Sequence, residues 1–165
     1  MARCLIIGCG CRGRLLASEL VGRGHAVRGT TRDPRRWAAI EAAGAEPVIA
    51  DPDRIVTLSP ALEHVAVAYV LLGAAAGDPA AVAALHGTRL DMLLQRMVDT
   101  TVRGIVYEAR GSVDRDVLGR GAALVQAFCG DARIPYALLE ADPGDAAGWV
   151  RVAADAADRM LLARG

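Results

Sequence analysis

The sequence predicts an α/β fold, in which one six-stranded parallel sheet of strand order 3-2-1-4-5-6 carries helices on both faces. Short apolar segments alternate six times with longer segments whose apolar residues recur at helical spacing. The connections between the apolar segments are too long for hairpins, which makes the strands parallel. No linker, repeat or low-complexity tract divides the 165 residues, so we expect one doubly wound domain spanning residues 1–165.

The first two strands flank a short helix. Residues 3–7 form a compact apolar run, as expected of a buried strand. The helix predicted over 12–21 carries leucines at helical spacing and is stopped by Gly22 and Gly24. A second strand is predicted to follow over 25–31.

The next elements are marked by their capping residues. Asp33 is the expected N-cap of a helix over 34–43, which begins with proline and ends at Gly44. A short third strand is predicted over 47–50, and residues 51–62 are expected to form a loop with a short helix.

The second half of the chain opens with an almost wholly apolar segment, 65–72, which is typical of a central parallel strand buried on both faces. Asp78 and Pro79 provide a cap and a first turn for one long helix from Ala80 to about Thr100. The remaining predicted elements are a strand over 103–107, a helix over 117–129, a strand over 136–139 and a final helix over 145–163.

The composition argues against several classes of function. The 19 basic residues balance 19 acidic ones, so global charge gives no reason to expect nucleic acid or an anionic membrane as a partner. All the basic residues are arginine, and no mechanism that needs a lysine can run on this chain alone. No segment reaches the roughly 18–20 consecutive apolar residues of a membrane span, and the N-terminus lacks the pattern of a signal peptide. The cysteines and histidines fit neither metal-ligand spacing nor a disulfide framework, so we expect no metal and reduced thiols, as in the cytoplasm.

A glycine loop follows the first strand directly. The sequence GCGCRG at this point is the pattern GxGxxG, set between a strand and a helix. Gly8 permits a tight turn, Gly10 lets the backbone approach a pyrophosphate, and Gly13 allows close packing of helix on strand. The helix N-terminus, where Cys11 and Arg12 lie, then faces the anion. The pattern therefore favours a dinucleotide-binding Rossmann domain over the alternative, a plain glycine-rich turn in a doubly wound fold.

The end of the second strand bears on the choice between NADP and NAD. An acidic residue about 20 positions after the loop would bind the ribose 2′-hydroxyl of NAD. This strand instead ends in Thr31 and Arg32, and an arginine there suits the 2′-phosphate of NADP. Arg35 and Arg36 could add charge-assisted contacts. In the competing interpretation, Asp33 only caps the following helix, the arginines are only solvated, and the cofactor is NAD.

The chain is similar to atypical and extended short-chain dehydrogenase/reductase proteins, NmrA-like proteins included, in four segments. These are GHAVRGTTRDP (24–34), AGAEPVIAD (43–51), LHGTR through VRGIVY (85–107) and RIPYALLE (133–140). Together with the glycine loop they extend over nearly the whole chain. The resemblance implies an NAD(P)-binding Rossmann fold.

The resemblance also implies a role for each matching residue. The loop glycines would line the pyrophosphate, and Arg32 would hold the adenosine phosphate. Asp51 would meet the adenine amino group, unless it only caps the following short helix. Leu72 and Gly73, at the end of the fourth strand, would lie beside the ribose and the nicotinamide. The candidate cofactor-binding residues are therefore Gly8, Gly10, Cys11, Arg12, Gly13, Thr31, Arg32, Asp51, Leu72 and Gly73.

The chain departs from the family where catalysis is expected. After the fifth strand the family usually has a serine pair, followed by a tyrosine and a lysine that lowers the tyrosine pKa. The serine-pair positions align best with Ala109 and Arg110, and no Tyr-x-x-x-Lys can exist without lysine. We expect the usual C-terminal substrate region to be missing or minimal. The glycine spacing also differs, because many members use GxxGxxG instead of GxGxxG. We therefore expect no catalytic residue.

Three functions remain open. The leading one is an NAD(P)-binding protein that prefers NADP(H) and acts as a dinucleotide sensor or partner-binding module. The alternative is a small NADPH-dependent reductase that passes hydride to a flavin- or quinone-like acceptor, with the cofactor supplying the chemistry. The third is a fold that no longer binds a ligand.

Further side chains carry weaker signals. Cys9 and Cys11 are interpreted as packing residues, with redox sensing as the alternative. Glu108 and Arg110, at the end of the fifth strand, either orient a substrate or form a local surface salt bridge. The apolar surplus of the long helix favours a homodimer. The expected core or interface anchors are Trp37 and Trp149.

Overall fold

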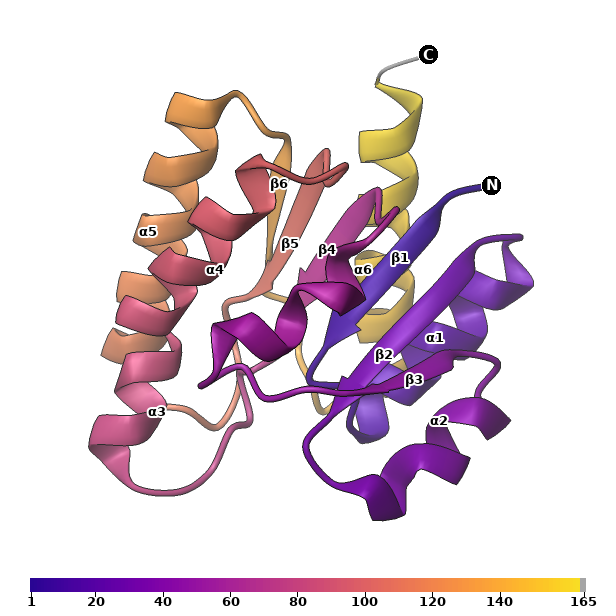
Figure 1. The fold of residues 1–165 in the computed structure, drawn as a ribbon, viewed down its shortest axis with the longest axis horizontal. Coiled ribbons are helices and arrows are strands. Elements are labelled where there is room, and N and C mark those ends of the chain that lie inside the picture. Colours follow the sequence, from indigo (N-terminus) through magenta and orange to yellow (C-terminus); the bar gives the residue numbers. More distant parts are fainter. Residues whose placement is uncertain (164–165) are drawn as a thin grey trace.

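Six parallel strands form one sheet in the computed structural model, which describes residues 1–163. The sheet order is β3-β2-β1-β4-β5-β6, and every neighbouring pair is parallel. The predicted α/β class and strand order are both confirmed (Figure 1). The strands are β1 (Arg3–Ile7), β2 (Ala26–Thr31), β3 (Glu46–Ile49), β4 (Val67–Val70), β5 (Gly104–Glu108) and β6 (Tyr136–Leu139).

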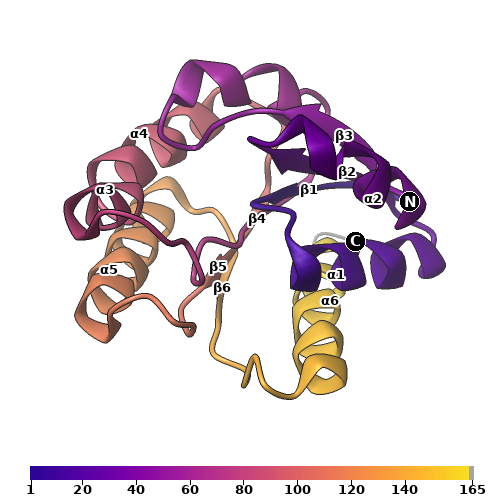
Figure 2. The same ribbon diagram turned by 90° about the horizontal axis from the view of Figure 1, so that it is seen from below.

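Helices cover both faces of the sheet (Figure 2). One face carries α1 (Cys11–Gly22), α2 (Trp37–Ala42) and α6 (Ala146–Leu162), and the other carries α4 (Thr88–Val98), α5 (Arg115–Ala132) and the 3-10 turns η2 (Ile55–Leu58) and η3 (Pro60–Leu62). Along β1, Cys4 and Ile6 face the first layer, whereas Leu5 and Ile7 face the second. This double coverage explains why the strands are continuous apolar runs. No helix within residues 1–163 is long and apolar enough to cross a membrane.

The single long helix predicted from Ala80 to about Thr100 is wrong. The structure has two helices there, α3 (Pro79–Leu85) and α4. His86 ends α3, and its imidazole is buried, where it hydrogen-bonds Tyr107 and the backbone of Leu72. Gly87 follows with φ −125° and ψ −104°, outside the helical region. Tertiary hydrogen bonds to His86 thus accompany the break, and the apolar periodicity of the segment does not reveal them.

The helix predicted over 34–43 also differs from its expected form. It begins as the 3-10 turn η1 (Pro34–Arg36) and continues as the six-residue α2. Asp33 does cap it, because its carboxylate accepts a hydrogen bond from the backbone N–H of Arg35 at 3.0 Å. Trp37, an expected core or interface anchor, lies outside the core with 42% of its surface exposed.

Ion pairs hold α6 against α1. Nη1 of Arg23, the residue that ends α1, lies 2.8 Å from carboxylate oxygens of both Asp155 and Asp158. His25 Nε2 lies 2.9 Å from the other oxygen of Asp158. Because α6 runs antiparallel to the strands, this attachment places its first turn, with Trp149, at the carboxyl edge of the sheet (Figure 1).

Candidate functional site

A cleft of about 870 Å³ lies at the carboxyl ends of β1, β2, β3 and β4. The sheet order reverses between β1 and β4, and ligands of open α/β sheets bind at such a switch point. Nine of the ten candidate residues border this cleft, namely Gly8, Gly10, Cys11, Arg12, Gly13, Thr31, Arg32, Asp51 and Leu72. The tenth, Gly73, does not.

The three loop glycines differ in what surrounds them. Gly8 has φ +84°, and a Cβ there would lie 2.5 Å from the carbonyl oxygen of Leu71, so only glycine fits the turn. A Cβ on Gly13 would lie 3.3 Å from the carbonyl oxygen of Gly8, which reflects close packing of α1 on β1. Gly10 has an ordinary φ of −84°, and a Cβ there would meet nothing within 4 Å. Neither packing nor backbone conformation therefore requires glycine at position 10.

The first turn of α1 carries hydrogen-bond donors without protein acceptors. The backbone N–H groups of Cys11, Arg12 and Gly13 form no hydrogen bond within residues 1–163, and Gly10 offers no side-chain cap. The loop before them is fixed, because the N–H groups of Gly8 and Cys9 donate to Thr30 at 3.1 and 2.9 Å. The helix dipole makes this end of α1 positive. The turn is thus suited to hold a negatively charged oxygen.

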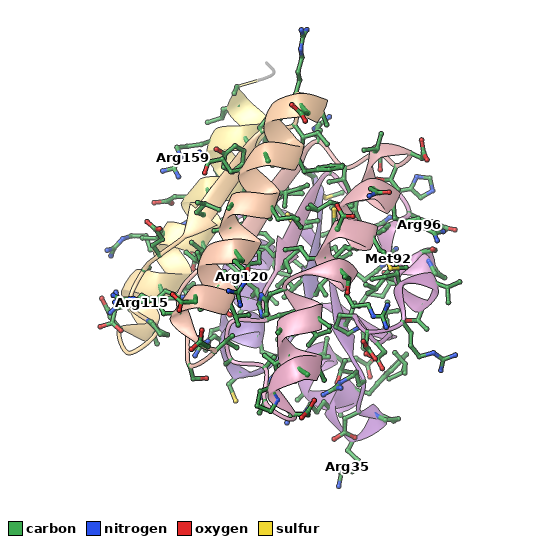
Figure 3. The ribbon with its side chains drawn as sticks, turned by 90° about the vertical axis from the view of Figure 1, so that its left-hand side faces the viewer. Arg35, Met92, Arg96, Arg115, Arg120 and Arg159 are labelled. Atoms are coloured by element: carbon green, nitrogen blue, oxygen red, sulfur yellow. The ribbon has the colours of Figure 1, made fainter. Side chains whose placement is uncertain are left out.

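Positive charge borders the cleft beside the end of β2. Arg32 and Arg36 are exposed there, and neither forms an ion pair within residues 1–163. Arg35 Nε lies 3.1 Å from the Asp33 carboxylate, and hydrogen bonds from Arg35 hold the pKa of that carboxyl below its usual value. Figure 3 shows Arg35 pointing away from the body of the molecule. Two guanidinium groups at this edge therefore remain available to an anion.

Asp51 does not cap the following short helix, the local role that the sequence left open, because η2 follows Arg54 without a side-chain cap. The Asp51 carboxylate accepts the backbone N–H of Asp53 at 2.9 Å, and its own N–H donates to Thr57 at 2.8 Å. The residue also borders the cleft opposite an apolar wall. That wall is formed by Leu71, Leu72, Ala74, Ala75, Ala76, Ala81, Val82 and Leu85. An adenine ring would find apolar surface here, and contact of its amino group with Asp51 stays a prediction.

A partly buried ion pair between Arg12 and Glu108 borders the cleft at the end of β5. Glu108, the last residue of β5, is 2% exposed, and its carboxylate lies 3.2 Å from Nη2 of Arg12. Its other oxygen accepts the backbone N–H of Gly73 at 2.6 Å. Burial raises the pKa of Glu108 above its usual value, against the opposing effects of the Arg12 charge and of both hydrogen bonds. The local surface salt bridge predicted for Glu108 and Arg110 is wrong, because Glu108 pairs with Arg12 of α1 and Arg110 Nη2 lies 3.8 Å from a carboxylate oxygen of Asp142.

The sequence did not predict that Trp149 lines the cleft. Its indole is 1% exposed and forms part of the wall of the cleft. The guanidinium of Arg12 lies 5.6 Å from the centroid of the ring. Within residues 1–163, Arg12 Nε and Trp149 Nε1 are buried without a hydrogen-bond partner. The only local signal was a tryptophan in the first turn of the last helix, and nothing in the sequence placed it beside the glycine loop.

The two loop cysteines lie in different environments. Cys9 is buried, and a Cβ on Gly29 would lie 2.8 Å from its sulfur. Burial raises the pKa of the Cys9 thiol to about 11, so the thiol is protonated at neutral pH. Cys11 is exposed, and Arg14 Nη2 lies 3.5 Å from its sulfur. Packing thus accounts for Cys9, and the structure gives Cys11 no packing role.

Comparison with models of protein families gave no match, and comparison with curated protein sequences gave none either. Solved structures do resemble the chain. A short-chain dehydrogenase/reductase superfamily protein from Agrobacterium tumefaciens with bound NAD matches with a TM-score of 0.69 and 20% identity, over 82% of this chain and 48% of that one. The chain thus has the Rossmann fold of short-chain dehydrogenase/reductase proteins.

Two further structures of named activity share this fold. The Citrobacter sp. triphenylmethane reductase complexed with NADP(H) matches with a TM-score of 0.62 and 17% identity, over 82% of this chain and 48% of that one. The Bacillus cereus UDP-glucuronic acid 4-epimerase in complex with NAD gives 0.66 and 16%, over 82% and 54%. This chain spans about half the length of these proteins.

Proposed function

We propose that this chain binds a nicotinamide adenine dinucleotide in the cleft. The observation that carries the proposal is the glycine loop, where Gly10 leaves open space beside three backbone N–H groups of α1 that lack protein acceptors. Phosphate oxygens accept hydrogen bonds from such groups, and the helix dipole favours their charge. The residues present fit the group, because a cationic edge after β2 and an apolar wall after β4 border the same cleft as the loop.

The same proposal includes a preference for NADP(H) over NAD(H). Arg32 and Arg36 stand at the end of β2 without a carboxylate partner within residues 1–163, whereas a ribose 2′-hydroxyl would call for an acidic acceptor. Asp33, the nearest acid, is already bound to Arg35. A 2′-phosphate would receive charge-assisted hydrogen bonds at this place.

We infer that the protein acts as a dinucleotide sensor or a partner-binding module, without Tyr-Lys catalysis. The chain has no lysine, and the serine-pair positions of the resembling family align best with Ala109 and Arg110. No tyrosine of residues 1–163 borders the cleft. Tyr107, at the end of β5, is fully buried and hydrogen-bonded to His86. The cleft therefore offers no tyrosine and no lysine within residues 1–163 to exchange a proton with a substrate.

A second candidate function is a small NADPH-dependent reductase with a flavin- or quinone-like acceptor. The similarity of the chain to the triphenylmethane reductase complexed with NADP(H) favours it. A bound dihydronicotinamide would supply hydride, and the chain would only hold and orient it. Steady oxidation of NADPH in the presence of a quinone or flavin would support this function, and binding without turnover would support the sensor.

Titration of the purified protein with NADPH and with NADH tests the proposal. Nucleotide fluorescence and melting temperature are followed together, because a ligand at 100 times its dissociation constant adds about 2.7 kcal/mol of stability. A selective response to NADPH is the expected result. The absence of any response to either nucleotide would leave the glycine loop as a plain turn and the fold without a ligand.

Two further proposals concern the cellular location and the oligomeric state of the protein. A cytoplasmic location is consistent with the four free cysteines, none of which is paired in residues 1–163. A homodimer is consistent with apolar side chains exposed on α4, where Met92, labelled in Figure 3, is 47% exposed. Val98, on the same helix, is 52% exposed. Sedimentation velocity of the wild type and of Met92→Asp would test the dimer, since a charge at this face should shift the protein to monomer.

A further inference from the structure

The cleft is unequal on the two sides of the glycine loop. Toward β2 and β3 it extends to Arg32, Asp51 and Asp53, but toward β5 and β6 it ends at Glu108 and Trp149. None of residues 109–114, after β5, or 140–145, after β6, borders it. The cleft also takes in residues 74–76 and part of α3, which follow β4. It is thus open beside β2, β3 and β4, where an adenosine would lie, and stops short of the loops after β5 and β6.

The edge of the sheet beyond β4 is filled by protein. Gly73 follows β4 and is buried, and a Cβ there would lie 2.6 Å from Oε1 of Glu108. Gly111, in the loop after β5, packs so closely on the Gly73 carbonyl that a Cβ on Gly111 would overlap it. The same carbonyl accepts the backbone N–H of Val113 at 3.0 Å. Backbone and side chain thus cover the end of β4 together.

Glu108 links three segments of the chain at this edge. The residue ends β5, its carboxylate binds the N–H of Gly73 after β4, and the same carboxylate binds Arg12 in α1 after β1. Arg12 is held in turn by the face of Trp149. Dinucleotides lie across the switch point, with one arm on each side of the glycine loop. The arm that turns toward β4 and β5 would meet the Glu108 side chain.

We propose that the cleft accepts an adenosine 5′-diphosphate group and that Glu108, held by Arg12, excludes the nicotinamide-bearing arm. The inference rests on the proposed function and specifies which part of the dinucleotide the chain recognises. An adenine nucleotide that ends at its second phosphate leaves the Arg12–Glu108 pair intact. A full dinucleotide seats its second arm only if Glu108 leaves Gly73 and Arg12, and otherwise that arm stays in solvent. Glu108 is thus the residue that decides specificity.

Calorimetric titration of the full chain with two ligands tests this inference. The ligands are NADP and 2′-monophosphoadenosine 5′-diphosphate, which lacks the nicotinamide-ribose arm. For the wild type we expect dissociation constants within about threefold of each other, because the arm gains no contact. Glu108→Ala removes the obstacle, and we expect it to strengthen NADP binding about tenfold relative to the shorter ligand.

Two more variants secure the interpretation. Glu108→Gln keeps the side-chain volume and an acceptor for Gly73 but loses the charge that holds Arg12, so it should give a smaller shift in the same direction. Glu140→Ala removes an exposed carboxylate just after β6, outside the cleft, and should leave the ratio of the two affinities unchanged. Two results would overturn the inference. One is a wild type that binds NADP more than about thirtyfold tighter than the shorter ligand. The other is a ratio of the two affinities that the Glu108 variants leave unchanged. If neither ligand binds the wild type, the proposed function is wrong, and the inference that rests on it is wrong as well.

Discussion

The hydroxyl of Tyr107 lies 2.6 Å from Nδ1 of His86, and Nε2 of the same imidazole lies 2.9 Å from the carbonyl oxygen of Leu72. A neutral imidazole satisfies all three groups, with Tyr107 donating to Nδ1 and Nε2–H donating to Leu72. Burial lowers the pKa of His86, which favours this neutral form. The chain of bonds joins β5, the break between α3 and α4, and the apolar wall of the cleft.

Replacing Tyr107 with phenylalanine should destabilise the protein. The substitution leaves Nδ1 of a buried histidine without a partner, and an unsatisfied buried group costs about 1–3 kcal/mol. Urea unfolding of Tyr107→Phe measures the loss. Tyr136→Phe is the matched control, because the Tyr136 hydroxyl forms no hydrogen bond to protein within residues 1–163, and its removal should cost less than about 0.5 kcal/mol. Equal losses for the two variants would show that the bond to His86 contributes nothing.

His86 should make the protein sensitive to acid. Its pKa in the folded state lies below 6.5, the ordinary value that applies in the unfolded chain. The unfolded state therefore binds more protons as the pH falls below about 6.5, and the contribution of neutral His86 to stability is lost as the pH falls through the folded pKa. Compared with His86→Gln, the wild type should lose unfolding free energy between pH 7.5 and pH 5. Parallel curves for the two proteins would contradict the assignment.

Gly10→Ala should separate binding from folding. A Cβ at this position meets no protein atom within 4 Å, so the free energy of unfolding should change by less than about 1 kcal/mol. The methyl group would occupy the space where a pyrophosphate approaches, and affinity for NADPH should fall at least about tenfold. Gly22→Ala, at a second open glycine in α1, serves as the control and should leave affinity unchanged. Unchanged NADPH binding by Gly10→Ala would remove the loop from the binding site.

Arg32→Asp should weaken binding of NADP more than binding of NAD. The arginine borders the cleft without an ion-pair partner in residues 1–163, and only NADP carries a 2′-phosphate for it to hold. We expect a loss of about tenfold or more for NADP and of less than about threefold for NAD. Arg120→Asp makes the same change of charge on the exposed face of α5 and should affect neither ligand (Figure 3). Equal losses for both ligands with Arg32→Asp would exclude contact with the 2′-phosphate.

The glycine loop could be predicted because its signals are local. Gly8, Gly10 and Gly13 lie between an apolar strand and a helix, and this context alone placed the turn at the switch point of the sheet. Arg12 and Glu108 are 96 residues apart, and their contact depends on the pairing of β4 with both β1 and β5. The sequence could offer Glu108 only as a charged residue at the end of a strand.

The alternation of apolar runs and amphipathic segments determined the α/β class and the position of the loop, because strand and helix periodicity are set by neighbouring residues. The strand order was predicted from the Rossmann interpretation of the glycine loop. The tertiary structure alone decided that the long helix breaks at His86, that Gly73 lies beneath Glu108, and that Trp149 forms cleft wall. Each of these depends on side chains from distant segments meeting at one edge of the sheet. Such contacts form only when the chain folds, so no local sequence pattern reveals them.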